Sequence, residues 1–234
     1  MRSMFRSRLV LGALFAATAA AAIGQAPASA PDVFGSRALA VDKSRYDARW
    51  NRVLKAGARS LVAPIAMPAK ALGPSAQLHY VNAAINRRVR YRFDQGPTGD
   101  QWATAEETLK RSAGDCEDYA IAKLQALRAL GVPADRLFMT IGHDSTAAAV
   151  HAVLVAEVQG RFWVLDNRFN RLVPHDQFHG FYPIISLGSG GRAWLHGYPP
   201  GKVPAAVKAM DMALRARREL PLGNSLGSAV ARKA

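Results

Sequence analysis

The only cysteine in the chain, Cys116, lies among acidic residues in the run Gly114-Asp115-Cys116-Glu117-Asp118. It also stands where a strongly helical pattern begins, so its thiol would lie beside unpaired N–H groups and the positive end of a helix dipole. Both effects favour the thiolate, which is the nucleophilic form of cysteine. The alternative is a buried structural cysteine. Because three carboxylates surround it, we take Cys116 as the candidate nucleophile.

A predicted hairpin offers a base and an acid to this nucleophile. Gln159-Gly160 can form a two-residue turn between two segments with strand-like composition. In the register of that turn, Val153 faces Asp166, and His151 becomes a diagonal neighbour of Asp166 on the same face of the sheet. Their Cα atoms are expected about 7–8 Å apart or less, within reach of a side-chain hydrogen bond. A slip of one residue would destroy this arrangement.

Cysteine, histidine and aspartate in this arrangement make up a nucleophile, a base and an orienting acid. His151 would take the thiol proton, and Asp166 would hold the imidazole and favour its charged form. A thiolate–imidazolium pair can bring the pKa of a cysteine to roughly 3.5–7.5. A histidine in an apolar strand is by itself more often a satisfied core residue. The combination with Cys116 is what indicates covalent acyl transfer.

The helix that carries Cys116 is the clearest element in the sequence. It is expected to run to Leu130, because Gly131 supplies a C-terminal stop and Pro133 prevents continuation. Its predicted apolar side consists of Ala120, Ile121, Leu124, Leu127 and Leu130, with Lys123, Gln125 and Arg128 at polar positions between them. A helix with such an apolar side is expected to pack in the core. Cys116, at the start of this helix, is therefore expected at the rim of the core.

Helices are expected before this element and antiparallel strands after it. Helical spacing begins near Ser44, a plausible N-cap, and again at Pro74, while a capping box at Thr104–Glu107 starts a short helix. The second of these helices has an apolar face made up of Leu78, Val81, Ile85 and Val89. Strands are predicted over 137–141, 150–158, 161–165 and 182–187. This order is an α+β layout.

The first residues have the features of a secretory leader. Arg2, Arg6 and Arg8 precede an uncharged apolar run, and Ala26-Pro27-Ala28 is a small-x-small cleavage signal. Residues 1–28 are therefore predicted to be a signal peptide that directs the protein to the periplasm. The apolar run is short for a bilayer span of about 20 residues, so an uncleaved anchor is the less favoured alternative. A single cysteine cannot form an internal disulfide, and the exported chain must rely on its core.

The predicted organisation after the leader has four parts: an N-terminal arm (29–44), one domain (45–200), an amphipathic helix (201–220) and a disordered tail (221–234). The basic face of the C-terminal helix is expected to be solvated, with binding to a membrane surface as the alternative. The formal charge is +14, or +11 without the three arginines of the leader. Because the basic residues are dispersed and no nucleic-acid-binding motif occurs, nucleic acid is not an expected partner.

Around the candidate site the chain resembles the bacterial transglutaminase-like cysteine proteinases, which include the LapG-type periplasmic adhesin proteases. The likeness extends over about 46–194. It is carried by Val81-Asn82, Asn86, Asp100, Trp102-Ala103-Thr104, Glu107, Gly114 to Lys123, Leu130-Gly131, His151-Ala152-Val153-Leu154 and Leu165-Asp166-Asn167. The resemblance implies a papain-like, transglutaminase-like α+β fold in which the nucleophile helix packs on an antiparallel sheet. It implies Cys116, His151 and Asp166 as the catalytic triad.

The resemblance also implies calcium and two protein partners. In LapG-type enzymes the acids beside the nucleophile bind the ion, and the matching residues here are Asp115 and Glu117. Two acids are too few for Ca²⁺, so backbone carbonyls, water or Asp118 would complete the shell. The alternative is that these acids only complement the helix dipole. The implied partners are a large surface adhesin, as substrate in biofilm control, and an inner-membrane receptor for cyclic di-GMP. No organic cofactor is implied.

Several alternatives stay open at this point. Trp102 is a candidate oxyanion donor through its indole N–H, or else a core residue. The same triad could transfer or deamidate glutamine amides, and the fold could serve as a catalytically silent binding module. Ala105, Gln101 and Ala152 stand where the family often has Pro, Tyr and Met, so substrate and receptor could differ. The sequence favours an exported, calcium-dependent cysteine endopeptidase.

Overall fold

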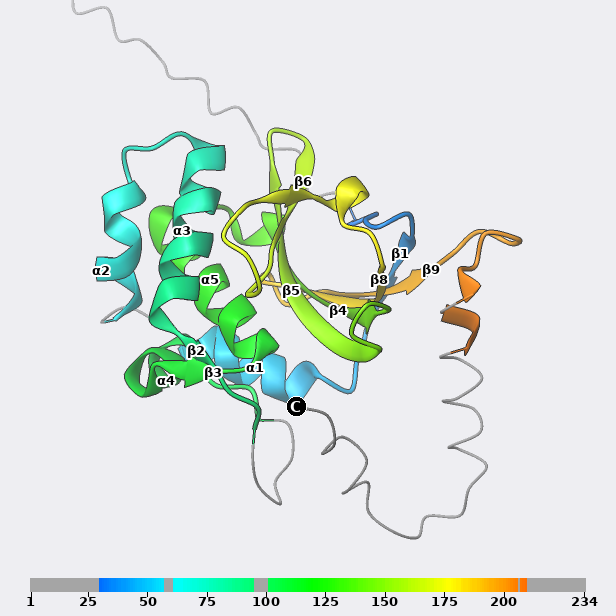
Figure 1. Ribbon diagram of the computed structural model, residues 1–234, viewed down its shortest axis with the longest axis horizontal. Helices are drawn as coiled ribbons and strands as arrows, with labels where there is room; N and C mark the ends of the chain where they lie inside the picture. Colours follow the sequence, from blue (N-terminus) through cyan, green and yellow to red (C-terminus); the bar gives the residue numbers. More distant parts are fainter. Residues whose placement is uncertain (1–29, 57–60, 95–100, 206, 210–234) are drawn as a thin grey trace, which may run out of the picture.

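The computed structural model describes residues 30–56, 61–94, 101–205 and 207–209. Its helices gather beside a curved antiparallel sheet (Figure 1). The helices are α1 (Asp47–Ala56), α2 (Val62–Ala66), α3 (Pro74–Arg88), α4 (Ala105–Arg111) and α5 (Cys116–Leu130), with 3-10 turns at Met67–Ala69, Ala134–Arg136 and His175–Gln177. The strands are β1 (Arg37–Val41), β2 (Arg90–Tyr91), β3 (Ala113–Gly114), β4 (Leu137–Asp144), β5 (Ala149–Val158), β6 (Arg161–Leu165), β7 (Val173–Pro174), β8 (Phe181–Gly188) and β9 (Ala193–Gly197).

Seven strands form one sheet in the order β1-β9-β8-β4-β5-β6-β7, and every neighbouring pair in it is antiparallel. The short strands β2 and β3 form a separate parallel pair, which joins the end of α3 to the segment before α5. Helix α5 contacts β4 and β5 in the middle of the large sheet. The predicted α+β class, with the nucleophile helix packed on an antiparallel sheet, is confirmed.

The predicted register of the β5–β6 hairpin is also confirmed. Leu154 pairs with Leu165 and Val158 with Arg161, as a two-residue turn at Gln159-Gly160 requires. Both turn residues have positive φ angles, 54° and 74°, which a type I′ turn needs at its two central positions. The β5–β6 pairing ends at Leu165. Asp166 therefore follows the last paired residue and lies beside β5, the strand that carries His151.

Helix α5 has the predicted bounds, and Gly131 ends it in the left-handed conformation with a φ of 94°. The five residues of its predicted apolar side are all buried. Of the polar positions between them, Arg128 is exposed, whereas Lys123 and Gln125 are buried. The reason is that α5 is covered on several sides, by α2, α3 and α4 as well as by the sheet. Hydrophobic periodicity alone underestimates how central this helix is.

Of two earlier helices with predicted start signals, α4 begins where its signal indicates, whereas Ser44 is not the N-cap residue of α1. Thr104 and Glu107 form the complete capping box of α4. Ser44 lies three residues before the start of α1 and donates to the Asp47 carboxylate through its N–H at 3.0 Å and its hydroxyl at 2.5 Å. Ser44 therefore shapes the approach to α1, and the helix starts later than its periodicity suggests.

The ends of the chain are only partly described. Residues 37–41, expected in the N-terminal arm, form the edge strand β1 and pair with β9. The predicted leader (1–28), the predicted tail (221–234) and most of the predicted helix (201–220) lie outside the described residues. Within the described ranges, no helix combines the length and apolar character needed to cross a membrane.

Candidate active site

One pocket of about 350 Å³ gathers most of the predicted site residues. Cys116, Asp115 and Glu117 reach it from the start of α5, His151 from β5, and Trp102 from the segment before α4. The other lining residues are aromatic, aliphatic or acidic: Tyr46, Tyr91, Phe93, Asp94, Ile141, Val150 and Ala152. The fold thus brings a thiol, an imidazole and two carboxylates, predicted from separate stretches of sequence, to the same cavity.

Asp166 lies behind His151 and is fully buried. Its Oδ2 is 3.1 Å from His151 Nε2, within hydrogen-bonding distance. This is the diagonal contact that the hairpin register predicts. Because Asp166 engages Nε2, Nδ1 is the imidazole nitrogen that is left to exchange a proton with a reacting group.

Arg168 is a site residue that the sequence reasoning missed. It binds Asp166 through its backbone N–H, 2.8 Å from Oδ1, and through Nη2, 2.7 Å from Oδ2. Its Nη1 is 2.5 Å from Oδ2 of Asp144 at the end of β4. Burial by itself would raise the pKa of Asp166, but the hydrogen bonds from His151 and Arg168 outweigh it and hold that pKa below its usual range. The position of an arginine two residues after the predicted acid was the sequence feature that could have indicated this ion pair.

Two asparagines of α3 hold the segment that follows Asp166. Asn86 Nδ2 donates to the carbonyls of Asp166 and Phe169, both at 3.0 Å. Asn82 Nδ2 donates to the carbonyls of Phe169 and Asn170, also at 3.0 Å. The two asparagines are four residues apart and therefore lie on the same face of the helix. They fix the backbone on which Asp166 and Arg168 are placed.

Cys116 is the first residue of α5 and is partly exposed. Its thiol donates to Oε2 of Glu117 at 3.1 Å. Burial raises the pKa of this thiol, and the negative charge of Glu117 raises it further, whereas the backbone N–H of Ala152 acts in the opposite direction. Burial and the Glu117 carboxylate therefore act against the lowering of this pKa that the helix end and an imidazolium were predicted to cause.

The predicted calcium ligands, Asp115 and Glu117, are 7% and 8% exposed and line the pocket together with Asp94. Asp115 is the N-cap residue of α5, yet its side chain makes no capping hydrogen bond, so capping does not account for this carboxylate. Carboxylate oxygens at one wall of a pocket fit the chemistry of Ca²⁺. Among the described residues, no three His, Cys, Asp or Glu side chains are grouped as a metal site. Backbone oxygens and water would have to complete the coordination.

Both oxygens of Asp118, a candidate for a further ligand, already accept hydrogen bonds within the protein. Its Oδ1 accepts the N–H of Ala103 at 2.8 Å, and its Oδ2 accepts from Nη2 of Arg111 at 3.0 Å. The carboxylate is fully buried and packs against Gly114. Asp118 therefore fastens the first turn of α5 to the residues before α4 and to the end of α4.

Trp102 lines the pocket and is also packed in the core. Its ring stacks on Tyr46 with centroids 5.2 Å apart and an interplanar angle of 13°, and it meets Trp50 edge-on at 6.3 Å. Both alternatives for Trp102 are thus compatible with its position, and its role as an oxyanion donor stays a prediction. The backbone N–H of Cys116 is a second candidate donor, because the first N–H groups of a helix have no partner within the helix.

The family model described as bacterial transglutaminase-like cysteine proteinase matches residues 65–185, more than half of the chain. The chain belongs to this family. Two solved forms of LapG from Legionella pneumophila are similar in structure. The calcium-bound form is 23% identical with a TM-score of 0.51, and the match covers 72% of this chain and 98% of that chain. The EGTA-treated form is 24% identical with a TM-score of 0.51, covering 70% and 97%. No curated protein matches the sequence.

As a bacterial transglutaminase-like cysteine proteinase, the protein is a cysteine peptidase. The likeness to LapG shows that the two chains share the transglutaminase-like arrangement of helices on an antiparallel sheet. The predicted family and fold are both confirmed. At this level of identity, the likeness to LapG concerns the fold, and the chemistry of the site has to be argued from its own residues.

Proposed function

We propose that this cysteine peptidase is an exported endopeptidase that cleaves a protein of the cell envelope or surface, with Cys116, His151 and Asp166 as its triad. The observation that carries the proposal is the 3.1 Å contact between His151 Nε2 and Asp166 Oδ2, at the wall of the pocket that holds Cys116. A buried acid oriented by Arg168 can keep the imidazole in one tautomer. A partly exposed thiol at a helix start, on the wall of a pocket, can approach a peptide carbonyl.

The proposed reaction uses these groups in sequence. His151 takes the thiol proton through Nδ1 as Sγ of Cys116 attacks the carbonyl carbon, and the carbonyl electron pair moves to oxygen. The Cys116 N–H and the Trp102 indole N–H would stabilise this oxyanion. His151 then protonates the leaving amine, which gives an acyl-enzyme thioester. Water, deprotonated by His151, hydrolyses the thioester and restores the thiol.

Calcium fits this proposal through Asp115 and Glu117. When bound, the ion would supply positive charge that offsets the two carboxylates beside the thiol. Glu117 would contact both the nucleophile and the ion, because its carboxylate accepts the thiol hydrogen bond and also belongs to the proposed ligand pair. The structure thus gives a physical reason why an acidic site next to a nucleophile would depend on a cation. Asp94 lines the same pocket, although it is not grouped with Asp115 and Glu117 as a metal site among the described residues.

The substrate is proposed to be a polypeptide with apolar residues near the scissile bond. Tyr91, Phe93 and Val150 line the catalytic pocket and remain 47%, 69% and 63% exposed. Large exposed apolar side chains beside a reactive pocket often mark a binding surface. Export is supported by the predicted leader. A large adhesin as substrate, a cyclic di-GMP receptor as regulator and a role in biofilm control are carried over from the family resemblance.

Mass spectrometry of cleaved envelope proteins tests this function. Purified protein and its Cys116→Ala variant are incubated with envelope proteins, with and without a calcium chelator. The proposal expects new fragments that need Cys116 and decrease with the chelator. A set of products identical for both variants would overturn the peptidase proposal. A one-dalton shift or cross-links at glutamine, without fragments, would favour deamidation or amide transfer instead.

A further inference from the structure

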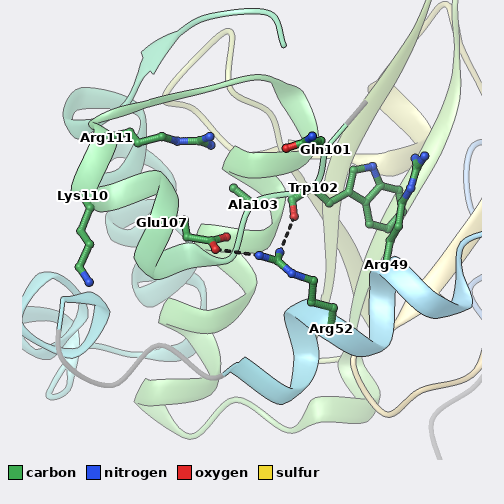
Figure 2. A pocket seen from close by; sticks show the side chains of 8 residues that line it. All are labelled: Arg49, Arg52, Gln101, Trp102, Ala103, Glu107, Lys110 and Arg111. Carbon is green, nitrogen blue, oxygen red and sulfur yellow. Dashed lines mark hydrogen bonds and ion pairs between the residues drawn. The ribbon is translucent and has the colours of Figure 1, made fainter. Parts of the chain in front are cut away.

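A second pocket, of about 630 Å³, lies between α1 and α4 and is rich in basic side chains (Figure 2). Arg49 and Arg52 project from α1, and Lys110 and Arg111 project from the last turn of α4. Its other lining residues are Gln101, Trp102, Ala103 and Glu107. Four cations and one carboxylate therefore line this basic pocket, and none of these five charged groups takes part in the proposed chemistry.

The one carboxylate of the basic pocket is held by local bonds. Glu107 Oε2 accepts the backbone N–H of Thr104 at 2.7 Å in the capping box, and Oε1 lies 2.7 Å from Nη2 of Arg52. Arg52 Nη1 also donates to the carbonyl of Trp102 at 3.0 Å. These contacts hold Arg52 and Glu107 in place, and they pair the negative charge of Glu107 with Arg52.

Two other cations of the lining, Lys110 and Arg111, have exposed side chains with N–H donors that can meet an anion. Lys110 lies 3.7 Å from Glu106, and their side chains are 68% and 25% exposed, so this is a weak surface pair. Arg111 binds the buried Asp118 through Nη2 alone and keeps 39% of its side chain exposed. A guanidinium has five N–H donors, so one such bond leaves others for a ligand. The exposed side chain of Arg49 adds a further charge.

The basic pocket adjoins the catalytic pocket. Trp102 lines both of them, so the two pockets meet at this residue. An extended chain advances about 3.3 Å per residue, so a polypeptide lying in the catalytic pocket crosses one side chain within a few residues. The occupant that this geometry favours is the substrate chain itself. A separate small ligand would have no reason to lie beside the nucleophile.

We propose that the basic pocket binds an acidic side chain of the polypeptide substrate, on one side of the scissile bond and within about two to five residues of it. This inference rests on the proposed endopeptidase function. The pocket thereby selects cleavage sites that have Asp or Glu at that distance. Lys110 and Arg111 supply the attraction, Arg49 adds positive charge to the lining, and Trp102 separates this subsite from the reacting carbonyl.

A peptide library read by mass spectrometry tests the proposal. The full chain and its Cys116→Ala variant are incubated with a proteome-derived peptide library, and the Cys116-dependent cuts are aligned. The expected result is enrichment of Asp and Glu at one position of that range. Peptide pairs that differ by Glu or Gln at this position then give the ratio of kcat/KM values. Arg49→Glu and Lys110→Glu should each lower this ratio about three- to tenfold, because each replaces an attraction by a repulsion.

Arg128→Glu is the matched control, since Arg128 is an exposed arginine in the last turn of α5, at the far end from Cys116. It makes the same charge change and should leave the Glu-to-Gln ratio at the wild-type value. Thermal unfolding checks that each variant is folded. The two test substitutions lie on separate helices, so if one variant fails to fold, the other can still be measured. Cys116-dependent cuts without any acidic preference, or an equal fall of the ratio in the control, would overturn the inference alone.

Binding measurements test whether the basic pocket prefers acidic side chains even if no cleavage occurs. Fluorescence anisotropy of Cys116→Ala with labelled Ala-rich dodecapeptides, one carrying three Glu and the other three Gln, should show tighter binding of the Glu peptide. That preference should weaken as salt rises and decrease in the Lys110→Glu background. Absence of Cys116-dependent cuts would overturn the proposed function. Equal binding of both peptides would overturn the basic pocket as an acidic subsite.

Discussion

Arg168 and Asp166 are joined by contacts from the backbone N–H and from the guanidinium, with Nη2 of Arg168 2.7 Å from Oδ2 of Asp166. His151 Nε2 binds the same oxygen at 3.1 Å. The arginine therefore fixes the acid that orients the proposed base, and it also ties this acid to Asp144 on β4. In this chain, an arginine outside the proposed triad positions one of the three proposed members.

Replacing Arg168 should reduce both activity and stability. Arg168→Met leaves two buried carboxylates without their guanidinium, and we expect a loss of about 2 kcal/mol in the free energy of unfolding. We expect kcat/KM to fall about tenfold or more, since 1.36 kcal/mol of transition-state stabilisation corresponds to a factor of ten. Arg168→Lys should recover only part of the activity, because an ammonium cannot reproduce the planar fork. Urea unfolding and steady-state kinetics measure both effects.

Arg171→Met is the control for this prediction, because Arg171 is an exposed arginine three residues away that contacts the ring of Phe169. It should retain near wild-type kcat/KM. Wild-type kcat/KM in Arg168→Met would show that Asp166 is positioned without the arginine.

The ionisation of Cys116 should respond to Glu117. Burial and then the Glu117 carboxylate raise the pKa of the thiol, so Glu117→Gln removes the second effect and should move the thiol pKa downward. In calcium-free buffer, the rate of alkylation by iodoacetamide should therefore reach half of its maximum at a lower pH in this variant. At any pH below that midpoint, each unit of downward shift gives about a tenfold faster reaction, in proportion to the thiolate fraction.

Glu106→Gln serves as the comparison for the alkylation experiment, because it neutralises a carboxylate on α4 that lies outside the catalytic pocket. Its alkylation profile should coincide with that of the wild type. An unchanged or higher midpoint in Glu117→Gln would show that Glu117 does not control the thiol.

Calcium binding should depend on Asp115 and Glu117. Isothermal titration of the chelator-treated protein should give one site, and Asp115→Ala or Glu117→Ala should abolish it or weaken it at least about tenfold, since each change removes a charged oxygen ligand. Bound calcium should also raise the thermal midpoint by mass action. Asp135→Ala, which removes an exposed acid of a 3-10 turn, should bind like the wild type. Full binding by both pocket variants would remove these residues from the site.

The glycine before the nucleophile should not tolerate a larger side chain. A Cβ at Gly114 would lie 2.5 Å from Asp118 Oδ2 and 2.6 Å from Asp118 Cβ. Because the Asp118 side chain is buried and held at both oxygens, we expect Gly114→Ala to destabilise the fold by about 1–3 kcal/mol. Gly190→Ala, where no atom lies within 4 Å of the new Cβ, should change stability little. Chemical denaturation of both variants compares them, and equal stability would contradict this packing argument.

Much of the site could be predicted because it depends on short-range patterns. The 3.6-residue period and Gly131 define α5, and the two-residue turn at Gln159-Gly160 fixes the hairpin register that places His151 beside Asp166. Each of these signals lies within one element or one turn. They are set by backbone sterics and by the choice of buried face, which a sequence displays directly.

Other features depend on how distant elements pack. Lys123 occupies an apparently polar position, yet the surrounding elements bury it completely and lower its pKa to about 7. The contact of Arg168 with Asp144 spans 24 residues, and the pairing of β1 with β9 joins the two ends of the domain.

Local patterns along the chain were enough to predict helix α5, the His–Asp hairpin and the acids beside Cys116. Which charges surround these groups depends on how the elements pack, and in the folded protein burial and Glu117 raise the pKa of the thiol that the helix end alone would lower. The physical reason is that propensity and period act between neighbours along the chain. Desolvation and ion pairing depend on every element that closes over a residue.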